Sequence, residues 1–104
     1  MKIGRVKWTK RAFDHIEEEN GDRRISRADI EEVLLSPRRS TRASPVGFVA
    51  DGREKWMVEG TVRERALAII LLRDSAFNAS PLTAWPLSGA PLRRYNAWRR
   101  SIRA

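Results

Sequence analysis

The sequence predicts a single α+β domain over residues 1–104: a short N-terminal strand and two helices, then a three- to four-stranded antiparallel sheet and a basic C-terminal helix. Three observations predict this class. The first half carries helix-capping signals, the middle carries short apolar runs separated by turn signals, and the C-terminal segment returns to helical spacing. A length of 104 residues suits one hydrophobic core, and no linker or repeat divides the chain.

The N-terminal strand and the first helix are predicted from residues 3–20. Residues 3–8 alternate between apolar and basic side chains, as in a short strand. Thr9 is a suitable N-cap for a helix that runs to about Asn20, where Asn20-Gly21 is a stop signal.

The second helix has the clearest local signals. Ser26 followed by Asp29 is close to a capping box, and Ile25 and Ile30 match a hydrophobic staple. Ser36-Pro37 ends this helix because the residue before proline avoids helical torsion angles.

The second half of the chain is predicted to form strands. Asp51-Gly52 is a hairpin signal, and the run from Ala66 to Leu72 is apolar on both faces, which places it centrally in the sheet. The expected strands are residues 46–50, 55–59, 66–72 and 82–85, and the expected connections are residues 38–45, 60–65 and 73–80. A last helix over residues 92–103 is predicted from an apolar stripe made of Leu92, Tyr95, Trp98 and Ile102.

The composition excludes several function classes. The chain has no cysteine and one histidine, His15, so disulfides, thiol catalysis and metal sites rich in cysteine or histidine are excluded, and we expect neither a metal nor a cofactor. Phosphate-binding glycine loops and nucleophile elbows are also absent. No apolar run approaches the ~20 residues of a membrane span, and no signal-peptide core follows the basic start. We therefore expect a cytoplasmic protein without membrane contact.

The net charge of +8 is distributed unevenly and predicts an anionic partner. Residues 1–13 and 93–104 are basic without any acid, residues 14–22 carry five acids and no base, and Arg38, Arg39 and Arg42 form a third basic cluster. RNA is the expected partner of such a small basic domain. The excess of arginine over lysine has a second explanation in codon usage, and both stay open.

The available side chains suit one kind of catalysis, which is metal-independent RNA cleavage. In this reaction the ribose 2′-hydroxyl attacks the adjacent phosphorus, and the protein must move protons and stabilise charge on the phosphorane. Arginine and lysine perform the second task well, while a carboxylate, a histidine or a lysine can act as the base.

Three regions of the sequence, which together cover most of the chain, resemble the small RelE-superfamily toxins of the BrnT type. The first half contains K-W-T-K-R-A-F-D-H-I and I-S-R-A-D-I-E-E-V-L-L-S-P, and the middle contains D-G-R-E-K-W-M-V-E-G before R-E-R-A-L-A-I-I-L-L. The end, P-L-T-A-W-P followed by L-R-R-Y, is similar to the last strand and arginine-rich helix of these toxins.

The resemblance implies a ribonuclease toxin, bound by a cognate antitoxin, with its active site on the open face of the sheet. His15 matches the helix histidine, Lys55 stands where the family usually has arginine, and Trp56 matches its tryptophan. The sequence departs from the family at Pro81 and Trp85, near which the last family strand often carries arginines. Such a protein would form a homodimer or a hetero-oligomer with its antitoxin.

These considerations give two sets of candidate residues. The expected catalytic residues are His15, Lys55, Arg94 and Tyr95, and the expected nucleic-acid-binding residues are Arg53, Arg63, Arg65, Arg93, Arg99 and Arg100. Each residue also has a structural interpretation, as an ion-paired, solvated or core side chain. Two other functions stay open for the whole chain, namely a non-catalytic nucleic-acid-binding module and a protein-interaction domain.

Overall fold

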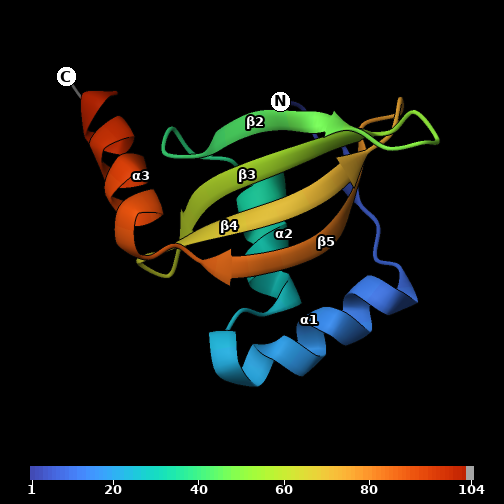
Figure 1. The fold of residues 1–104 in the computed structure, drawn as a ribbon, viewed down its shortest axis with the longest axis horizontal. Helices are drawn as coiled ribbons and strands as arrows, with labels where there is room; N and C mark the ends of the chain where they lie inside the picture. The colour runs from blue at the N-terminus through green and yellow to red at the C-terminus, as the bar shows by residue number, and fades with distance from the viewer. Residues whose placement is uncertain (103–104) are drawn as a thin grey trace.

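Four antiparallel strands form the centre of the molecule, and a short fifth strand joins them in parallel (Figure 1). The computed structural model describes residues 1–102, except for the side chains of residues 19–23. The strand order is β1–β5–β4–β3–β2. The predicted α+β class is confirmed, but the sheet has five strands and is mixed because β1 pairs in parallel with β5. The strands are β1 (Arg5–Val6), β2 (Arg42–Phe48), β3 (Glu54–Val62), β4 (Arg65–Arg73) and β5 (Asn78–Pro86).

Three helices flank this sheet, namely α1 (Lys10–Arg23), α2 (Arg27–Leu35) and α3 (Gly89–Ser101). α2 crosses one face of the sheet, α1 runs beside β5, and α3 stands at one end of the strands (Figure 1). Within the described residues, none of these helices has the length and apolarity that crossing a membrane requires.

The two N-terminal helices begin at the predicted caps. The Thr9 hydroxyl accepts a hydrogen bond from the Ala12 amide at 3.1 Å. Ser26 and Asp29 form the reciprocal capping box, with distances of 3.1 Å and 3.0 Å between each side chain and the other residue's amide. These bonds satisfy amides that a helix start leaves without partners.

β4 is the central strand, as its sequence predicts. Leu67, Ile69 and Leu71 have no exposed surface and pack in the main core with residues of α1 and α2. On the opposite face, Ala68 is buried in a second cluster with Tyr95 of α3. Full burial of one leucine or isoleucine contributes roughly 1.5–3 kcal/mol, so β4 stabilises both cores.

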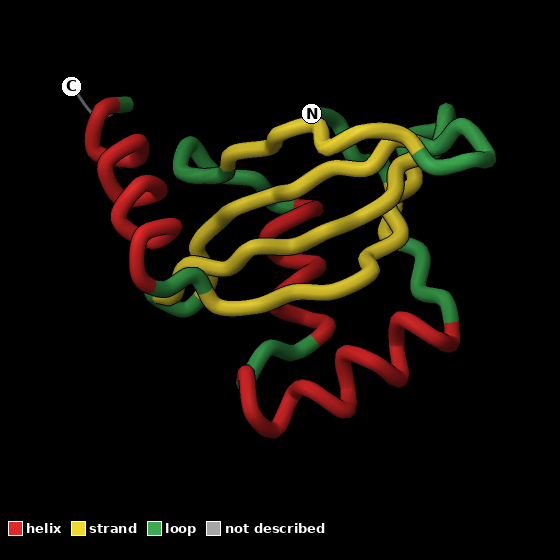
Figure 2. The backbone as a smooth tube through the Cα atoms, in the orientation of Figure 1, coloured by secondary structure: helices red, strands yellow, loops and turns green. Residues whose placement is uncertain are grey.

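The sheet face opposite α2 is covered only at one end, where α3 packs against it (Figure 2). The remainder of this open face presents a row formed by Met57, Ile70 and Thr83, which are paired across β3, β4 and β5. Lys55, paired with Leu72, belongs to the neighbouring row. The open face is therefore mainly apolar, with one lysine.

The predicted boundaries of β2 and β3 were wrong. β2 begins at Arg42 instead of residue 46, and Pro45 is accommodated at the exposed edge of the sheet beside a bulge. β3 continues through Gly60 to Val62. Glycine suits this position of the strand because a Cβ atom there would lie 2.7 Å from Cγ1 of Val33 in α2. The expected turn over residues 60–65 shrinks to residues 63–64.

The prediction for β5 was also too short. The expected loop over residues 73–80 ends at residue 77, and β5 includes Pro81 and Pro86. Pro81 is tolerated because it lies at a register shift, where Leu82 is an extra residue between the Leu71–Pro81 and Ile70–Thr83 pairs. This bulge lies next to the site described below.

Candidate functional site

The structure separates the predicted site residues into different parts of the molecule. Arg53 lies at the β2–β3 hairpin, Arg63 and Arg65 lie at the β3–β4 turn, and His15 lies on α1. The remaining arginines are on α3, while Lys55 is on the open sheet face. The fold therefore does not gather the expected catalytic set in one place.

Tyr95 occupies a structural position that does not support its predicted role in proton transfer. The residue is 0% exposed, and its hydroxyl donates to the backbone carbonyl of Ser40 and lies 3.0 Å from the Thr61 hydroxyl. A buried hydroxyl that is held in this way has no access to a substrate. Tyr95 instead ties α3 to the loop before β2.

Three predicted RNA-binding arginines are engaged within the protein. Arg53 forms an ion pair with Asp51 at 2.8 Å, and this pairing lowers the pKa of the Asp51 carboxyl below its ordinary value. Arg63 pairs with the capping residue Asp29, and Arg65 donates to the backbone carbonyl of Arg24. Their positions favour the structural interpretation over phosphate binding.

The arginines of α3 divide into one inward and three outward side chains. Arg99 donates to the Thr61 hydroxyl at 3.1 Å and lies over the Tyr95 ring. Arg93, Arg94 and Arg100 are exposed, and within the described part of the chain no ion pair engages them. These three residues remain available to an anionic partner.

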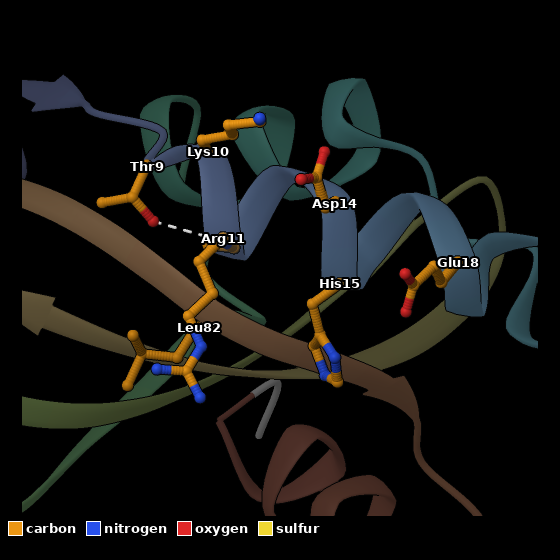
Figure 3. A pocket seen from close by; sticks show the side chains of 8 residues that line it. Thr9, Lys10, Arg11, Asp14, His15, Glu18 and Leu82 are labelled. Carbon is orange, nitrogen blue, oxygen red and sulfur yellow. Dashed lines mark hydrogen bonds between the residues drawn. The ribbon is translucent and has the colours of Figure 1, made fainter.

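His15 lines a pocket that has a volume of about 850 Å³ and is open to solvent. The pocket lies between α1 and the bulge of β5. In Figure 3, Arg11 and His15 extend from one side of α1 toward the strand, and Glu18 follows one turn later. The pocket is lined by Thr9, Lys10, Arg11, Ala12, Asp14, His15, Glu18 and Leu82.

The helical spacing explains why these side chains share one side of α1. Arg11, His15 and Glu18 are four and three residues apart, and residues at such spacings are neighbours on a helix, with Cβ atoms roughly 5–6 Å apart. The bulge aims Leu82 at the same space, since an extra residue in a strand redirects its side chain. The pocket therefore combines an imidazole, a carboxylate and a guanidinium beside the side chain of Leu82.

The residues that sequence reasoning missed are Arg11 and Glu18. Each was assigned to a charge block, basic before residue 14 and acidic after it. The pocket lies at the boundary of these two blocks, and the spacing of both residues from His15 was a usable signal.

Comparisons with protein-family models, curated proteins and solved structures find no match for this chain. Within the described residues, no group of three or more histidine, aspartate or glutamate side chains is arranged to hold a metal ion.

Proposed function

We propose that this protein is a ribonuclease that cleaves RNA by internal attack of the ribose 2′-hydroxyl, and that it is the toxin of a toxin–antitoxin pair. The observation that carries the proposal is the pocket between α1 and β5, where the chain's one histidine lies between Arg11 and Glu18. The resemblance of the sequence to RelE-superfamily toxins of the BrnT type supports the same reaction class.

The reaction needs three tasks, and the pocket holds a side chain for each. Glu18 accepts the proton of the 2′-hydroxyl while the oxygen forms a bond to phosphorus. His15 gives a proton to the 5′-oxygen as its bond to phosphorus breaks. Arg11 stabilises the charge on the phosphorane between these steps, since a guanidinium matches phosphate geometry. The products are a 2′,3′-cyclic phosphate and a free 5′-hydroxyl.

The direct test uses the purified chain and end-labelled single-stranded RNA. We expect fragments with 2′,3′-cyclic phosphate ends, no cleavage of DNA of the same sequence, and activity that persists in a chelator. His15→Gln should slow cleavage by at least about 100-fold, because general acid–base catalysis contributes roughly 10²–10⁴ in rate.

Glu17→Gln is the matched control for this test. Glu17 is on α1 but outside the pocket, where it pairs with Arg27 at 3.4 Å, so its substitution should leave the cleavage rate unchanged. Equal cleavage by wild type and His15→Gln would exclude the proposed site. Absence of cleavage by the wild type would exclude the reaction.

Expression in a bacterial host tests the toxin part of the proposal. Induction of the wild type should arrest growth, and His15→Gln should restore it at equal protein level. Lys55→Gln tests the rival location on the open sheet face, where Lys55 is half-buried opposite Leu72. Rescue by Lys55→Gln and not by His15→Gln would move the active site to that face.

A second function, binding of nucleic acid without cleavage, is favoured by the exposed arginines of α3. Arg93, Arg94 and Arg100 offer three cations without internal ion pairs among the described residues. This function predicts RNA binding that weakens steeply with salt, by roughly 0.7 in the log–log slope per phosphate contacted on a single strand. Intact RNA after prolonged incubation, together with this salt dependence, would favour it over cleavage.

A further inference from the structure

A second pocket lies at the C-terminal end of α3, and arginines from two distant segments line it. Its volume is about 260 Å³, and its lining consists of Arg38, Arg39, Ser40, Arg99 and Ile102. The loop before β2 contributes the first three residues, and Arg99 of α3 and the C-cap residue Ile102 contribute the rest. The C-terminal end of α3 lies on the other side of the molecule from α1 (Figure 1).

The loop and the helix are fastened to each other, so the pocket is a built feature of the fold. Tyr95 donates to the Ser40 carbonyl, and the Arg39 guanidinium donates to the Ile102 carbonyl at 3.2 Å. Within the loop, the Thr41 hydroxyl accepts from the Arg38 amide at 3.1 Å, and the Thr41 amide donates to the Arg38 carbonyl at 2.9 Å.

Among the described residues, the charged side chains that line this pocket are all basic. Three arginines line it, and none of the described lining residues is acidic. The nearby carboxylate of Glu59 is only 5% exposed and is bound by Arg42 at 2.7 Å. Like charges held together in this way favour an anion that neutralises them.

The guanidinium groups also retain hydrogen-bond donors. Among the described residues, Arg39 donates to the Ile102 carbonyl and Arg99 donates to the Thr61 hydroxyl, and a guanidinium carries several more N–H groups. Within the described residues, no hydrogen bond or ion pair engages the Arg38 side chain. These donors suit the oxygens of a phosphate, which arginine binds in a bidentate manner.

The C-terminal end of α3 would otherwise repel an anion, because helix carbonyls there carry partial negative charge. The structure reduces this effect. The Trp98 carbonyl accepts from the Ile102 amide and the Ser101 hydroxyl, and the Ile102 carbonyl accepts from Arg39. The Trp98 and Ile102 carbonyls therefore already have donors at this end of the helix, and a guanidinium lies beside the second one.

We propose that this pocket binds a phosphate monoester, a function separate from the proposed cleavage and located elsewhere on the molecule. The volume of about 260 Å³ is below the roughly 300–1,000 Å³ of pockets that enclose drug-sized ligands, so it suits the phosphoryl group and not a whole nucleotide. A monoester carries more negative charge than a backbone phosphodiester, and three arginines match that charge. The 5′-terminal phosphate of a nucleic acid and free inorganic phosphate are the two sources.

The test compares short DNA strands with and without a 5′-phosphate, because DNA lacks the 2′-hydroxyl and survives a ribonuclease. Fluorescence anisotropy should show tighter binding of the phosphorylated strand by at least about tenfold, since one or more charge-assisted hydrogen bonds contribute this much. Arg38→Ala and Arg39→Ala should each reduce the preference. Arg5→Ala, an exposed arginine of β1 outside the pocket, is the charge-matched control and should retain it.

Inorganic phosphate distinguishes the two sources. Inorganic phosphate is titrated into the protein at constant ionic strength, and the NMR shifts of the Arg38 and Arg39 amides are followed. The site is supported if these shifts saturate in the wild type and do not saturate in Arg38→Ala. Saturation without preference for a 5′-phosphorylated strand assigns the site to free phosphate. The proposal is overturned if neither probe saturates, or if Arg5→Ala loses binding as fully as Arg38→Ala. A failure of RNA cleavage would leave these results unaffected.

Discussion

The pocket between α1 and β5 and the surface of α3 both attract anions, but their side chains suit different tasks. The first pocket mixes a histidine, carboxylates and cations along one helix. The charged residues that line the second region are all arginines among the described residues, and they come from α3 and the loop before β2. Proton transfer needs both a donor and an acceptor, whereas phosphate binding needs only positive charge and N–H donors. We therefore propose that the first region serves catalysis and the second serves binding.

The largest expected effect is on the cleavage rate of Arg11→Gln. Arg11 is assigned to the phosphorane, so its loss should lower the rate at saturating RNA by about 100-fold, as the loss of one transition-state donor typically does. The affinity for RNA should change little, because many other cations contact the strand. Single-turnover cleavage with excess protein measures the two effects separately.

Arg94→Gln is the reciprocal variant, because it removes one charge from α3. Its affinity for RNA should fall while its rate at saturation stays at the wild-type value. If Arg94→Gln instead slows the saturated rate and Arg11→Gln does not, the division between the regions is wrong and α3 carries the chemistry.

A smaller effect is expected on the salt dependence of RNA binding. Replacing Arg93, Arg94 and Arg100 together by glutamine should lower the log–log slope by about 2, since each phosphate contact on a single strand contributes roughly 0.7. Titrations between low and moderate salt measure this slope. An unchanged slope would show that the RNA path avoids α3 and follows another basic surface.

Tyr95→Phe tests whether α3 is attached as the structure indicates. The variant loses the hydrogen bonds to Thr61 and Ser40, so we expect a loss of about 1–2 kcal/mol in unfolding free energy. Urea denaturation measures this loss, and the saturated cleavage rate should stay unchanged. A large fall in that rate, with intact stability, would restore Tyr95 as a catalytic residue.

Local signals in the sequence were sufficient for much of the fold. The caps at Thr9 and Ser26 act within one helical turn, and the apolar run over residues 66–72 requires burial on both faces of a sheet. Gly60 and Pro81 misled the prediction because both residues usually interrupt strands. Tertiary structure explains why each residue lies within a strand. Gly60 packs against Val33 of α2, and Pro81 lies at the bulge opposite β4.

The site was harder to predict for a related reason. Residue type marked Arg63 and Tyr95 as candidates, but their partners Asp29 and Ser40 are 34 and 55 residues away in the sequence. Only tertiary pairing shows that these groups are already engaged. His15 was predicted as a catalytic residue; it lies in a pocket, and its role in catalysis stays a prediction.

The smallest expected effect concerns Asp74, whose turn leads into β5 and the first pocket. Its carboxylate accepts hydrogen bonds from the Asn78 side chain at 3.0 Å and from the Ala76 and Asn78 amides at 2.9 Å. These bonds, the one from the Asn78 side chain first, lower the pKa of Asp74 below its ordinary value of 3.8. Folding therefore favours the ionised form, and this stabilisation is present above pH 3.8 and is lost as the pH falls through the lower, folded-state pKa.

Asp74→Asn should therefore reduce stability at neutral pH by a small amount and flatten the acid side of the stability curve. Thermal melts between pH 5 and about 2.5 measure this slope. Asp51→Asn is the matched comparison, because the pKa of Asp51 is also lowered, in this case by Arg53. Asp51 lies in the β2–β3 hairpin, which contributes no residue to the lining of the first pocket. If Asp74→Asn also loosens the first pocket, cleavage will fall in that variant and not in Asp51→Asn. Equal activity of both variants would show that the bulge positions Leu82 independently of the turn before β5.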